Sequence, residues 1–258
     1  MPDGLRLALT TLTVLPVRGP RRLDRRTGGQ AMALAPLAGV LLALPAGTAA
    51  YLVRLLDGGD LLAAAVAVTA LALLTRGLHL DGLADLVDGL ASYRDPEQTR
   101  AVMKSPGLGP MGAVALVLVL LVQVAALAQC YGDHRGTACL VLAVATGRLA
   151  ATWACSGPPS ATATGLGALV AGTVARRVPL LWAAALGLAA AAYAVVDPHG
   201  ESVGLELLRT TAALVVGLGA ARLLQVHAVR RVGGVTGDVL GALVEVSTAA
   251  TLLVLALG

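Results

Sequence analysis

The residues with the clearest capacity for chemistry are three aspartates, Asp81, Asp85 and Asp88, in the string HLDGLADLVDG. They follow one another at spacings of four and three, so on a helix their carboxylates share one face. Carboxylates this close repel one another unless water or a cation lies among them. Oxygen donors without neighbouring thiols favour Mg²⁺ or Mn²⁺, and Mg²⁺ usually completes its shell with water and substrate phosphates. The string therefore predicts a magnesium site for phosphoryl transfer.

The same string has an alternative interpretation as an interfacial helix whose carboxylates are simply solvated. Acidic residues between apolar runs are usually functional, which favours the metal site. His79, at the start of the string, is a candidate ligand, base or phosphate contact, or else a polar anchor. Glu97, in the loop that follows, is expected to be solvated.

A second polar segment, residues 230–238 (RRVGGVTGD), leads into the last apolar run. Its glycines, Gly237 among them, would let backbone amides approach a phosphate. Asp238 would either complete a cation site or cap the helix that follows. Glu245, two turns further on, is expected to face inward in a hydrogen-bonded or paired state.

Two cationic residues could meet an anionic substrate. Lys104 begins the segment KSPGLGPMG (104–112), which either closes over a substrate or is only the entry to a helix. Arg148 lies inside an apolar run, where a buried guanidinium needs an anionic partner. That partner would be a protein carboxylate or a substrate phosphate.

The elements that must position these residues are membrane helices. Of the 258 residues, 57% are hydrophobic and 13% are charged, against about 45–50% and about 25% in soluble domains. A spanning helix needs about 20 apolar residues, and the chain has seven candidate runs. These are residues 31–56, 60–76, 110–130, 137–155, 178–196, 203–226 and 239–257. We predict an all-α, polytopic membrane bundle of about seven spans, forming one domain over residues 1–258, with residues 4–17 too short to span.

The charges between these runs predict the orientation in the membrane. Arg and Lys gather in alternate loops with the N-terminus, around residues 18–26, 94–104, 176–177 and 230–231. The opposite loops are short and acidic, as at Asp57, Asp133 and Asp197. The N-terminus and the aspartate string are therefore expected to be cytoplasmic, in a plasma (inner) membrane.

The net charge is +4, but no aromatic stacking platform accompanies it. Nucleic acid is therefore not expected as a partner, whereas the lipid bilayer is.

Several motifs occur together in an order that is typical of one family. GLHLDGLADLVDGL (77–90), MKSPGLGPMG (103–112) and GGVTGDVLGALVE (233–245) are separated by apolar runs, and GLGALVAG (165–172) falls between them. The chain thereby resembles the cobalamin synthase family, the adenosylcobinamide-GDP ribazoletransferases, over nearly its whole length. One departure is that Ser105, Pro106 and Gly107 stand where the family commonly has an acidic residue.

The resemblance implies a reaction in which α-ribazole, or its 5′-phosphate, attacks adenosylcobinamide-GDP. GMP leaves, and adenosylcobalamin or its 5′-phosphate is formed with the help of Mg²⁺. Asp81, Asp85 and Asp88 are then expected to hold the metal. Asp238 would be a further metal ligand or the general base. Phosphate charge would be neutralised by His79, Lys104 and Arg148, and Gly237 would contact the substrate. Homo-oligomers are possible.

Two other functions fit these residues less well. A CDP-alcohol phosphotransferase also clusters aspartates on membrane helices, but it would need an Ala-Arg pair and later aspartates that this string does not have. An ion-coupled secondary transporter would place its acids near the midplane and contain internal repeats. The acids here lie at one edge of the expected bundle, and no repeat is visible.

Overall fold

The computed structural model describes residues 1–196 and 202–257, which form twelve helices and no strand. The helices are α1 (Asp3–Leu12), α2 (Arg25–Ala33), α3 (Ala35–Leu55), α4 (Gly59–Leu74), α5 (Leu78–Ala91), α6 (Pro96–Met103), α7 (Pro110–Gly132), α8 (Gly136–Ala154), α9 (Gly165–Val170), α10 (Arg177–Val196), α11 (Val203–Val232) and α12 (Gly237–Leu255). The all-α prediction is confirmed.

Six of these helices are individually long and apolar enough to cross a membrane: α3, α7, α8, α10, α11 and α12. The run predicted as 60–76 became α4, which meets this test only together with α5, across a bend of 87°. Counting that pair as one span gives the seven that were predicted. The bend occurs at Arg76 and Gly77, which both have positive φ angles of 56° and 67°. It turns the aspartate string out of line with α4.

The first and sixth spans differ from their predicted limits. The first begins at Ala35 instead of residue 31, because α2 ends separately at Ala33. The sixth continues to Val232 instead of ending at 226, and it stops where Gly233 adopts a left-handed conformation with φ 89°. The guanidinium of Arg231 lies 5.6 Å from the centre of the Tyr93 ring, so the extra turns end beside the α5–α6 connection.

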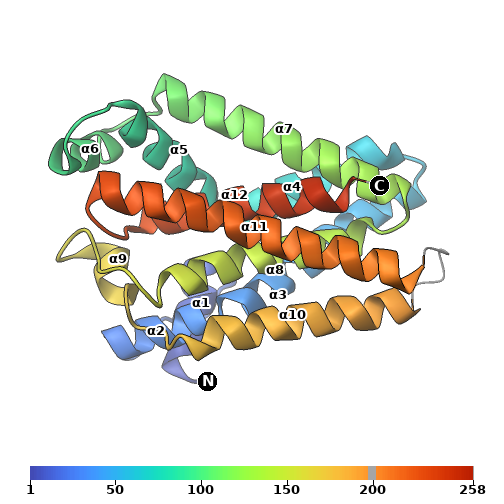
Figure 1. Cartoon of the computed structure of the whole chain (residues 1–258), viewed down its shortest axis with the longest axis horizontal. Coiled ribbons are helices and arrows are strands. Elements are labelled where there is room, and N and C mark those ends of the chain that lie inside the picture. The colour runs from blue at the N-terminus through green and yellow to red at the C-terminus, as the bar shows by residue number, and fades with distance from the viewer. Residues whose placement is uncertain (197–201, 258) are drawn as a thin grey trace.

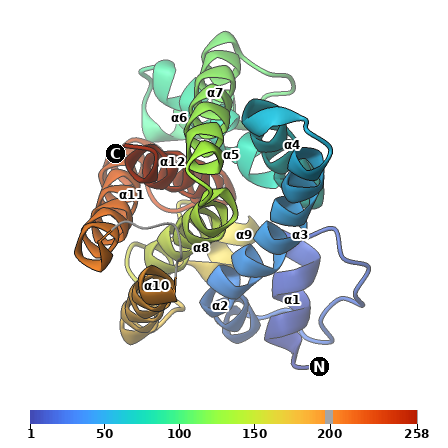
Figure 2. The same cartoon turned by 90° about the vertical axis from the view of Figure 1, so that its right-hand side faces the viewer.

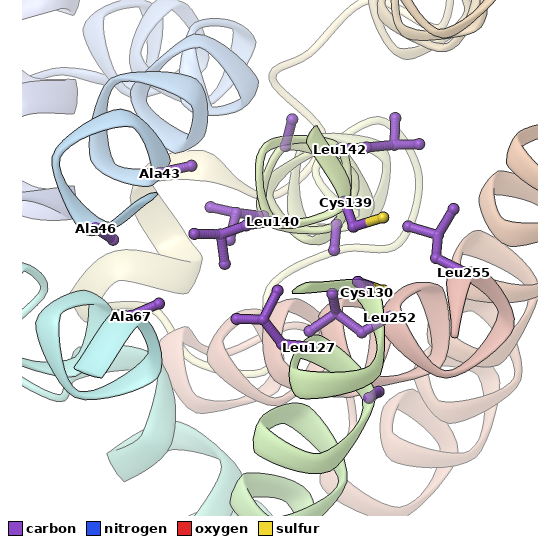
Figure 3. Packing of buried hydrophobic residues seen from close by; sticks show 14 of the residues in the cluster. Ala43, Ala46, Ala67, Leu127, Cys130, Cys139, Leu140, Leu142, Leu252 and Leu255 are labelled. Carbon is purple, nitrogen blue, oxygen red and sulfur yellow. The ribbon is translucent and has the colours of Figure 1, made fainter. Parts of the chain in front are cut away.

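Small residues bring the spans close together, as Figure 3 shows for the largest part of the core. Ala43 and Ala46 of α3 and Ala67 of α4 are fully buried and face larger residues such as Leu127 and Leu140. Alanine allows close backbone approach, so van der Waals packing can hold helices together where lipid removes the hydrophobic drive between them. The absence of Phe from the sequence agrees with this kind of core.

The two ends of the bundle differ in character. Figure 1 places α2, α5, α6, α9 and the turn between α11 and α12 at one end, which we call the site end. The chain's C-terminus lies at the opposite end, and Figure 2 views the bundle from there. The acidic loop containing Asp197 lies outside the described residues.

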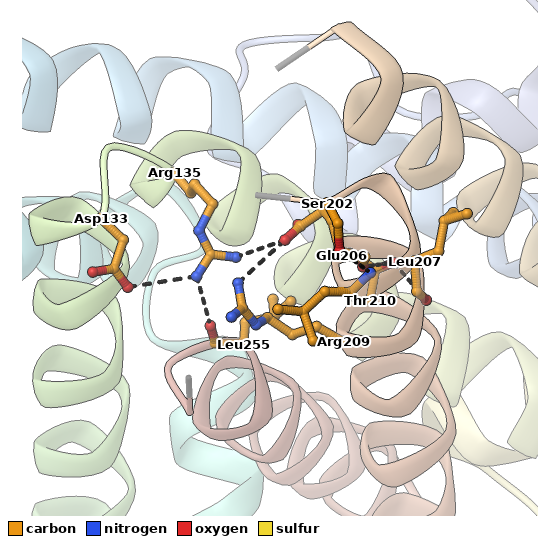
Figure 4. Close-up of polar contacts among 9 residues, drawn as sticks. Asp133, Arg135, Ser202, Glu206, Leu207, Arg209, Thr210 and Leu255 are labelled. Atoms are coloured by element: carbon orange, nitrogen blue, oxygen red, sulfur yellow. Dashed lines mark hydrogen bonds and ion pairs between the residues drawn. The ribbon is translucent and has the colours of Figure 1, made fainter. Parts of the chain in front are cut away.

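A buried ion-pair network ties helices together at the end opposite the site (Figure 4). Glu206 of α11 accepts from Arg135 at 3.0 Å and from Arg209 at 3.2 Å. Arg135 also donates to the backbone carbonyl of Leu255 at 3.4 Å. Because these charges are paired inside the protein, α8, α11 and α12 are fixed to one another well away from the aspartates.

Candidate active site

Two glycines allow the aspartate helix α5 to pack directly against the start of α12. A Cβ atom on Gly82 would lie 2.9 Å from the Cα of Asp238, and one on Gly241 would lie 3.1 Å from the carbonyl oxygen of His79. Only hydrogen fits between the two backbones at these points. The glycines of both motifs therefore bring Asp81 and Asp238, which are 157 positions apart, to one site.

A cavity of about 350 Å³ lies at this junction. Five of the predicted site residues line it: His79, Asp81, Lys104, Gly237 and Asp238. The cavity thus combines two carboxylates, one ammonium and the N-terminal end of a 19-residue helix. The positive end of the helix dipole and the ammonium favour an anion, whereas the carboxylates favour a cation.

His79 is buried in the cavity wall, with 5% of its surface exposed. Its Nδ1 atom has no hydrogen-bond partner among the described residues. A buried, unpaired ring nitrogen is costly to leave unsatisfied, so this atom is available to a ligand.

Asp85 and Asp88 lie on the same face of α5 but do not line the cavity. Asp85 is partly buried, and its carboxylate experiences the negative charges of Asp81, Asp238 and Asp88. Asp88 points instead at the N-terminus of α7, where it accepts hydrogen bonds from the backbone amides of Gly109 at 2.9 Å and Gly112 at 2.8 Å. The acidic face of α5 thus serves both the cavity and the anchoring of α7.

The Asp88 contact explains the glycines at the start of α7, Gly109 and Gly112. A Cβ on Gly112 would lie 2.8 Å from the carbonyl oxygen of Ala84 and 2.4 Å from Oδ2 of Asp88.

We expect Gly112→Ala to push α7 away from α5 and to lower the free energy of unfolding by about 1–3 kcal/mol. Thermal melting in detergent measures this effect. Gly187→Ala in α10 is the matched control, since a Cβ there meets nothing within 4 Å. Equal melting temperatures for the two variants would contradict the proposed packing.

Arg148 does not line the main cavity but a separate, smaller one of about 20 Å³, together with Gln123 and Glu245. The Nε2 atom of Gln123 donates to Glu245 at 2.8 Å, and Arg148 and Glu245 attract each other electrostatically. The inward, hydrogen-bonded placement predicted for Glu245 is confirmed. Of the two partners that the sequence left open for Arg148, the structure supplies the protein carboxylate. A contact between Arg148 and phosphate stays a prediction.

The cavity wall also contains residues to which the sequence assigned no chemistry. Arg100 of α6 lines it and donates to the carbonyl oxygen of Val232 at 2.6 Å. The segment before and within α9 contributes Thr162, Thr164 and residues 165–167. Solvent-facing arginines and short threonine-rich loops are common, so these residues had no distinguishing local signal. The resemblance of residues 165–172 to a family motif was the one indication that this loop matters.

The loop before α9 is held against the loop before α12. Val235 donates to the carbonyl of Pro159 at 2.9 Å, and Ala161 donates to the carbonyl of Val235 at 3.1 Å. A Cβ on Gly167 would lie 2.4 Å from that same Val235 oxygen. Two loops that are about 75 residues apart in sequence thus form one wall of the cavity.

The side chains in the cavity can supply only part of the coordination shell of Mg²⁺. Among the described residues, no group of three or more His, Cys, Asp or Glu side chains is placed to hold a metal ion. Asp88 is turned toward α7, which leaves Asp81 and Asp238 as the carboxylates in the cavity. Mg²⁺ commonly binds one or two carboxylates and takes its remaining ligands from water and substrate phosphates. Two carboxylates beside an anion-binding helix end fit that pattern.

Comparison with known proteins gives a consistent result over the whole chain. The model of the cobalamin-5-phosphate synthase family matches residues 4–256. An adenosylcobinamide-GDP ribazoletransferase of Frankia casuarinae is 48% identical, over 98% of this chain and 94% of the relative. Proteins of the same name from a Nocardioides species and from Corynebacterium efficiens are 43% and 36% identical, over 98% and 96% of this chain and 98% and 89% of theirs. No solved structure matches. The chain therefore belongs to the cobalamin-5-phosphate synthase family of membrane-embedded transferases.

Proposed function

We propose that this protein joins adenosylcobinamide-GDP to α-ribazole or its 5′-phosphate. A hydroxyl oxygen of the ribazole attacks the phosphorus on the cobinamide side of the pyrophosphate. The bond between that phosphorus and the bridging oxygen breaks, so that GMP leaves with the bridging oxygen. The hydroxyl proton passes to a carboxylate of the site. The products are adenosylcobalamin, or its 5′-phosphate, and GMP.

The observation that carries this proposal is the meeting of Asp81, Asp238 and Lys104 in one cavity, in a chain of this family. A cavity of about 350 Å³ can hold the phosphates of a ligand but not a whole corrinoid nucleotide. The corrin and guanosine parts would therefore extend out of the cavity. Neither a CDP-alcohol phosphotransferase nor a transporter is supported by the family match.

Catalysis in phosphoryl transfer comes mainly from positioning and charge neutralisation. Lys104 and Arg100, both in the cavity wall, would neutralise phosphate oxygens. The start of α12, at Gly237, adds backbone amides and the positive end of the helix dipole.

Asp81 and Asp238 would hold Mg²⁺, which supplies positive charge to the pyrophosphate oxygens when bound. Asp85, whose carboxylate experiences the charges of both, would strengthen the negative potential that attracts the cation. Asp88 would act indirectly, by holding α7 against the helix that positions Asp81 and Asp85.

Isotopic labelling tests which bond breaks. With ³²P on the cobinamide-side phosphorus, we expect the label in the corrinoid product, and with ³²P on the guanosine side we expect it in GMP. Chromatography of the products after one turnover separates these outcomes. Label from the cobinamide-side phosphorus appearing in the released nucleotide would contradict attack at the proposed phosphorus.

The site end is proposed to face the cytoplasm of a cell bounded by a plasma (inner) membrane. Basic residues are concentrated in the loops at that end, in agreement with the positive-inside rule. A membrane-impermeant thiol reagent should label cysteines introduced at Arg94 and Arg230 only from the cytoplasmic side. A cysteine introduced at Asp133 should be labelled only from outside. All three variants are made in a protein whose native cysteines have been replaced. Labelling of position 133 from the cytoplasm would overturn this orientation.

A further inference from the structure

A groove of about 340 Å³ lies along α8, α11 and α12, and it shares no lining residue with the active-site cavity. Its apolar walls include Trp153, Leu218 and Leu243, and its charged or amide side chains are Arg222 and Gln225. Figure 1 shows α10 and α11 diverging toward the site end, with α8 between them. All three lining helices are candidate membrane spans, so the groove belongs to the part of the protein that meets lipid.

Arg222 is exposed in this groove although it lies within a membrane span. Ten residues separate it from the end of α11 at Val232, or about 15 Å at 1.5 Å per residue. Its Nη1 atom donates to Oε1 of Gln225 at 2.8 Å. Because Gln225 lies one turn closer to the site end, the guanidinium extends toward the headgroups of that leaflet. A cation at this depth is costly in hydrocarbon and calls for an anionic partner.

Gln225 supplies a second, independent indication that a ligand occupies the groove. Its side chain lines the groove, only 3% of the residue is exposed, and its Nε2 atom has no hydrogen-bond partner among the described residues. Its oxygen is already used by Arg222, so what remains is a buried donor without an acceptor. Leaving such a group unsatisfied is unfavourable, and an acceptor from outside the chain would relieve this.

The chemistry of the groove selects among possible occupants. Its polar side chains offer donors and one positive charge, and none of its described lining residues is a carboxylate. A second copy of the chain would supply no counterion from its membrane surface, because the six helices that could each span the membrane have no exposed carboxylate in their described parts. Trp153 lies one residue before the end of α8, where aromatic residues commonly mark the membrane interface.

We propose that this groove binds an anionic phospholipid from the leaflet at the site end. The headgroup phosphate accepts hydrogen bonds from Arg222 and from Nε2 of Gln225. One acyl chain lies along the apolar wall formed by Trp153, Leu218 and Leu243. This lipid site is separate from the active site and does not depend on the proposed reaction.

Native mass spectrometry of the full-length protein in mild detergent tests the proposal, with phosphatidylglycerol and phosphatidylcholine added in parallel. The wild type should retain one phosphatidylglycerol per chain in preference to phosphatidylcholine. Arg222→Gln should weaken phosphatidylglycerol binding at least about 10-fold, since a charge-assisted phosphate contact is lost, and should leave phosphatidylcholine binding unchanged. Arg176→Gln, an exposed arginine at the same end but outside the groove, controls for general surface charge.

A second variant fills the groove without removing the charge. Gly219 lines the groove, and a Cβ there meets nothing within 4 Å, so Gly219→Leu fits the backbone and favours the helix. It should block phosphatidylglycerol binding even if Arg222→Gln fails to fold. Gly187→Leu in α10, equally open and outside the groove, is the matched control.

Two results would overturn the proposal. One is equal phosphatidylglycerol binding by the wild type and the folded Arg222→Gln and Gly219→Leu variants. The other is a wild-type dimer that these two variants convert to monomers, which would assign the groove to a second copy of the chain.

Discussion

Asp238→Asn should lower kcat at least about 100-fold, or about 2.7 kcal/mol in the barrier, while the protein stays folded. Asparagine keeps the size of the aspartate and can still accept from Thr236, whose hydroxyl lies 3.3 Å from Oδ2 of Asp238. The change removes the negative charge that would attract a cation into the cavity. Asp81→Asn should act in the same way, because Asp81 and Asp238 line the same cavity.

The control for this prediction is Glu97→Gln in α6. Glu97 is an exposed carboxylate in the first turn of α6 and does not line the cavity, so its neutralisation should change kcat within a few-fold. Steady-state GMP release measures all three variants, and circular dichroism in detergent checks folding. Near-normal turnover by Asp238→Asn, or equal losses in Glu97→Gln, would remove the cavity from its catalytic role.

Chelation of divalent cations should reduce activity to background, a loss at least as large as that caused by Asp238→Asn. Mg²⁺ or Mn²⁺ should restore turnover, whereas Ca²⁺ should not. Ca²⁺ prefers six to eight ligands at longer distances, while two carboxylates and substrate phosphates suit a compact octahedral ion. The measurement is GMP release in EDTA, followed by addition of each metal in excess. Full activity in EDTA would contradict the metal role of Asp81 and Asp238.

The spans were predictable because each must present about 20 apolar residues to lipid. The expected start of the last span at residue 239, for example, agrees with α12 beginning at Gly237. The bend between α4 and α5 was harder to foresee, because Arg76 is an unusual residue to adopt a positive φ angle. The guanidinium of Arg76 donates to the backbone carbonyl of Thr10 at 3.0 Å, a contact that depends on how α1 packs and that the local sequence does not indicate.

The aspartates show where reasoning from spacing stops. Helical periodicity correctly placed Asp81, Asp85 and Asp88 on one face of α5. It could not show that α7 begins beside Asp88 and binds its carboxylate through two amides, since that contact depends on helix packing. For the same reason Arg100 was not identified, because it reaches the cavity from α6 only once α6 has packed beside the end of α11.

Arg148 illustrates how a correct physical requirement can leave two structural solutions. A buried guanidinium needs an anion, and both a substrate phosphate and a protein carboxylate satisfy that requirement. The sequence contains Glu245 but does not show that it lies near Arg148, about 100 residues earlier. The structure brings the two together in the walls of the smaller cavity.

Acceptor-dependent release of GMP from adenosylcobinamide-GDP tests the proposed function most directly. The purified protein, in detergent with Mg²⁺, should release GMP when α-ribazole is present and form one corrinoid product for each GMP. Release should stop when α-ribazole is left out, and Asp238→Asn should show at most about one hundredth of the wild-type rate. GMP release that does not require α-ribazole, or the absence of release from folded wild-type protein with both substrates and Mg²⁺, would contradict the proposed reaction.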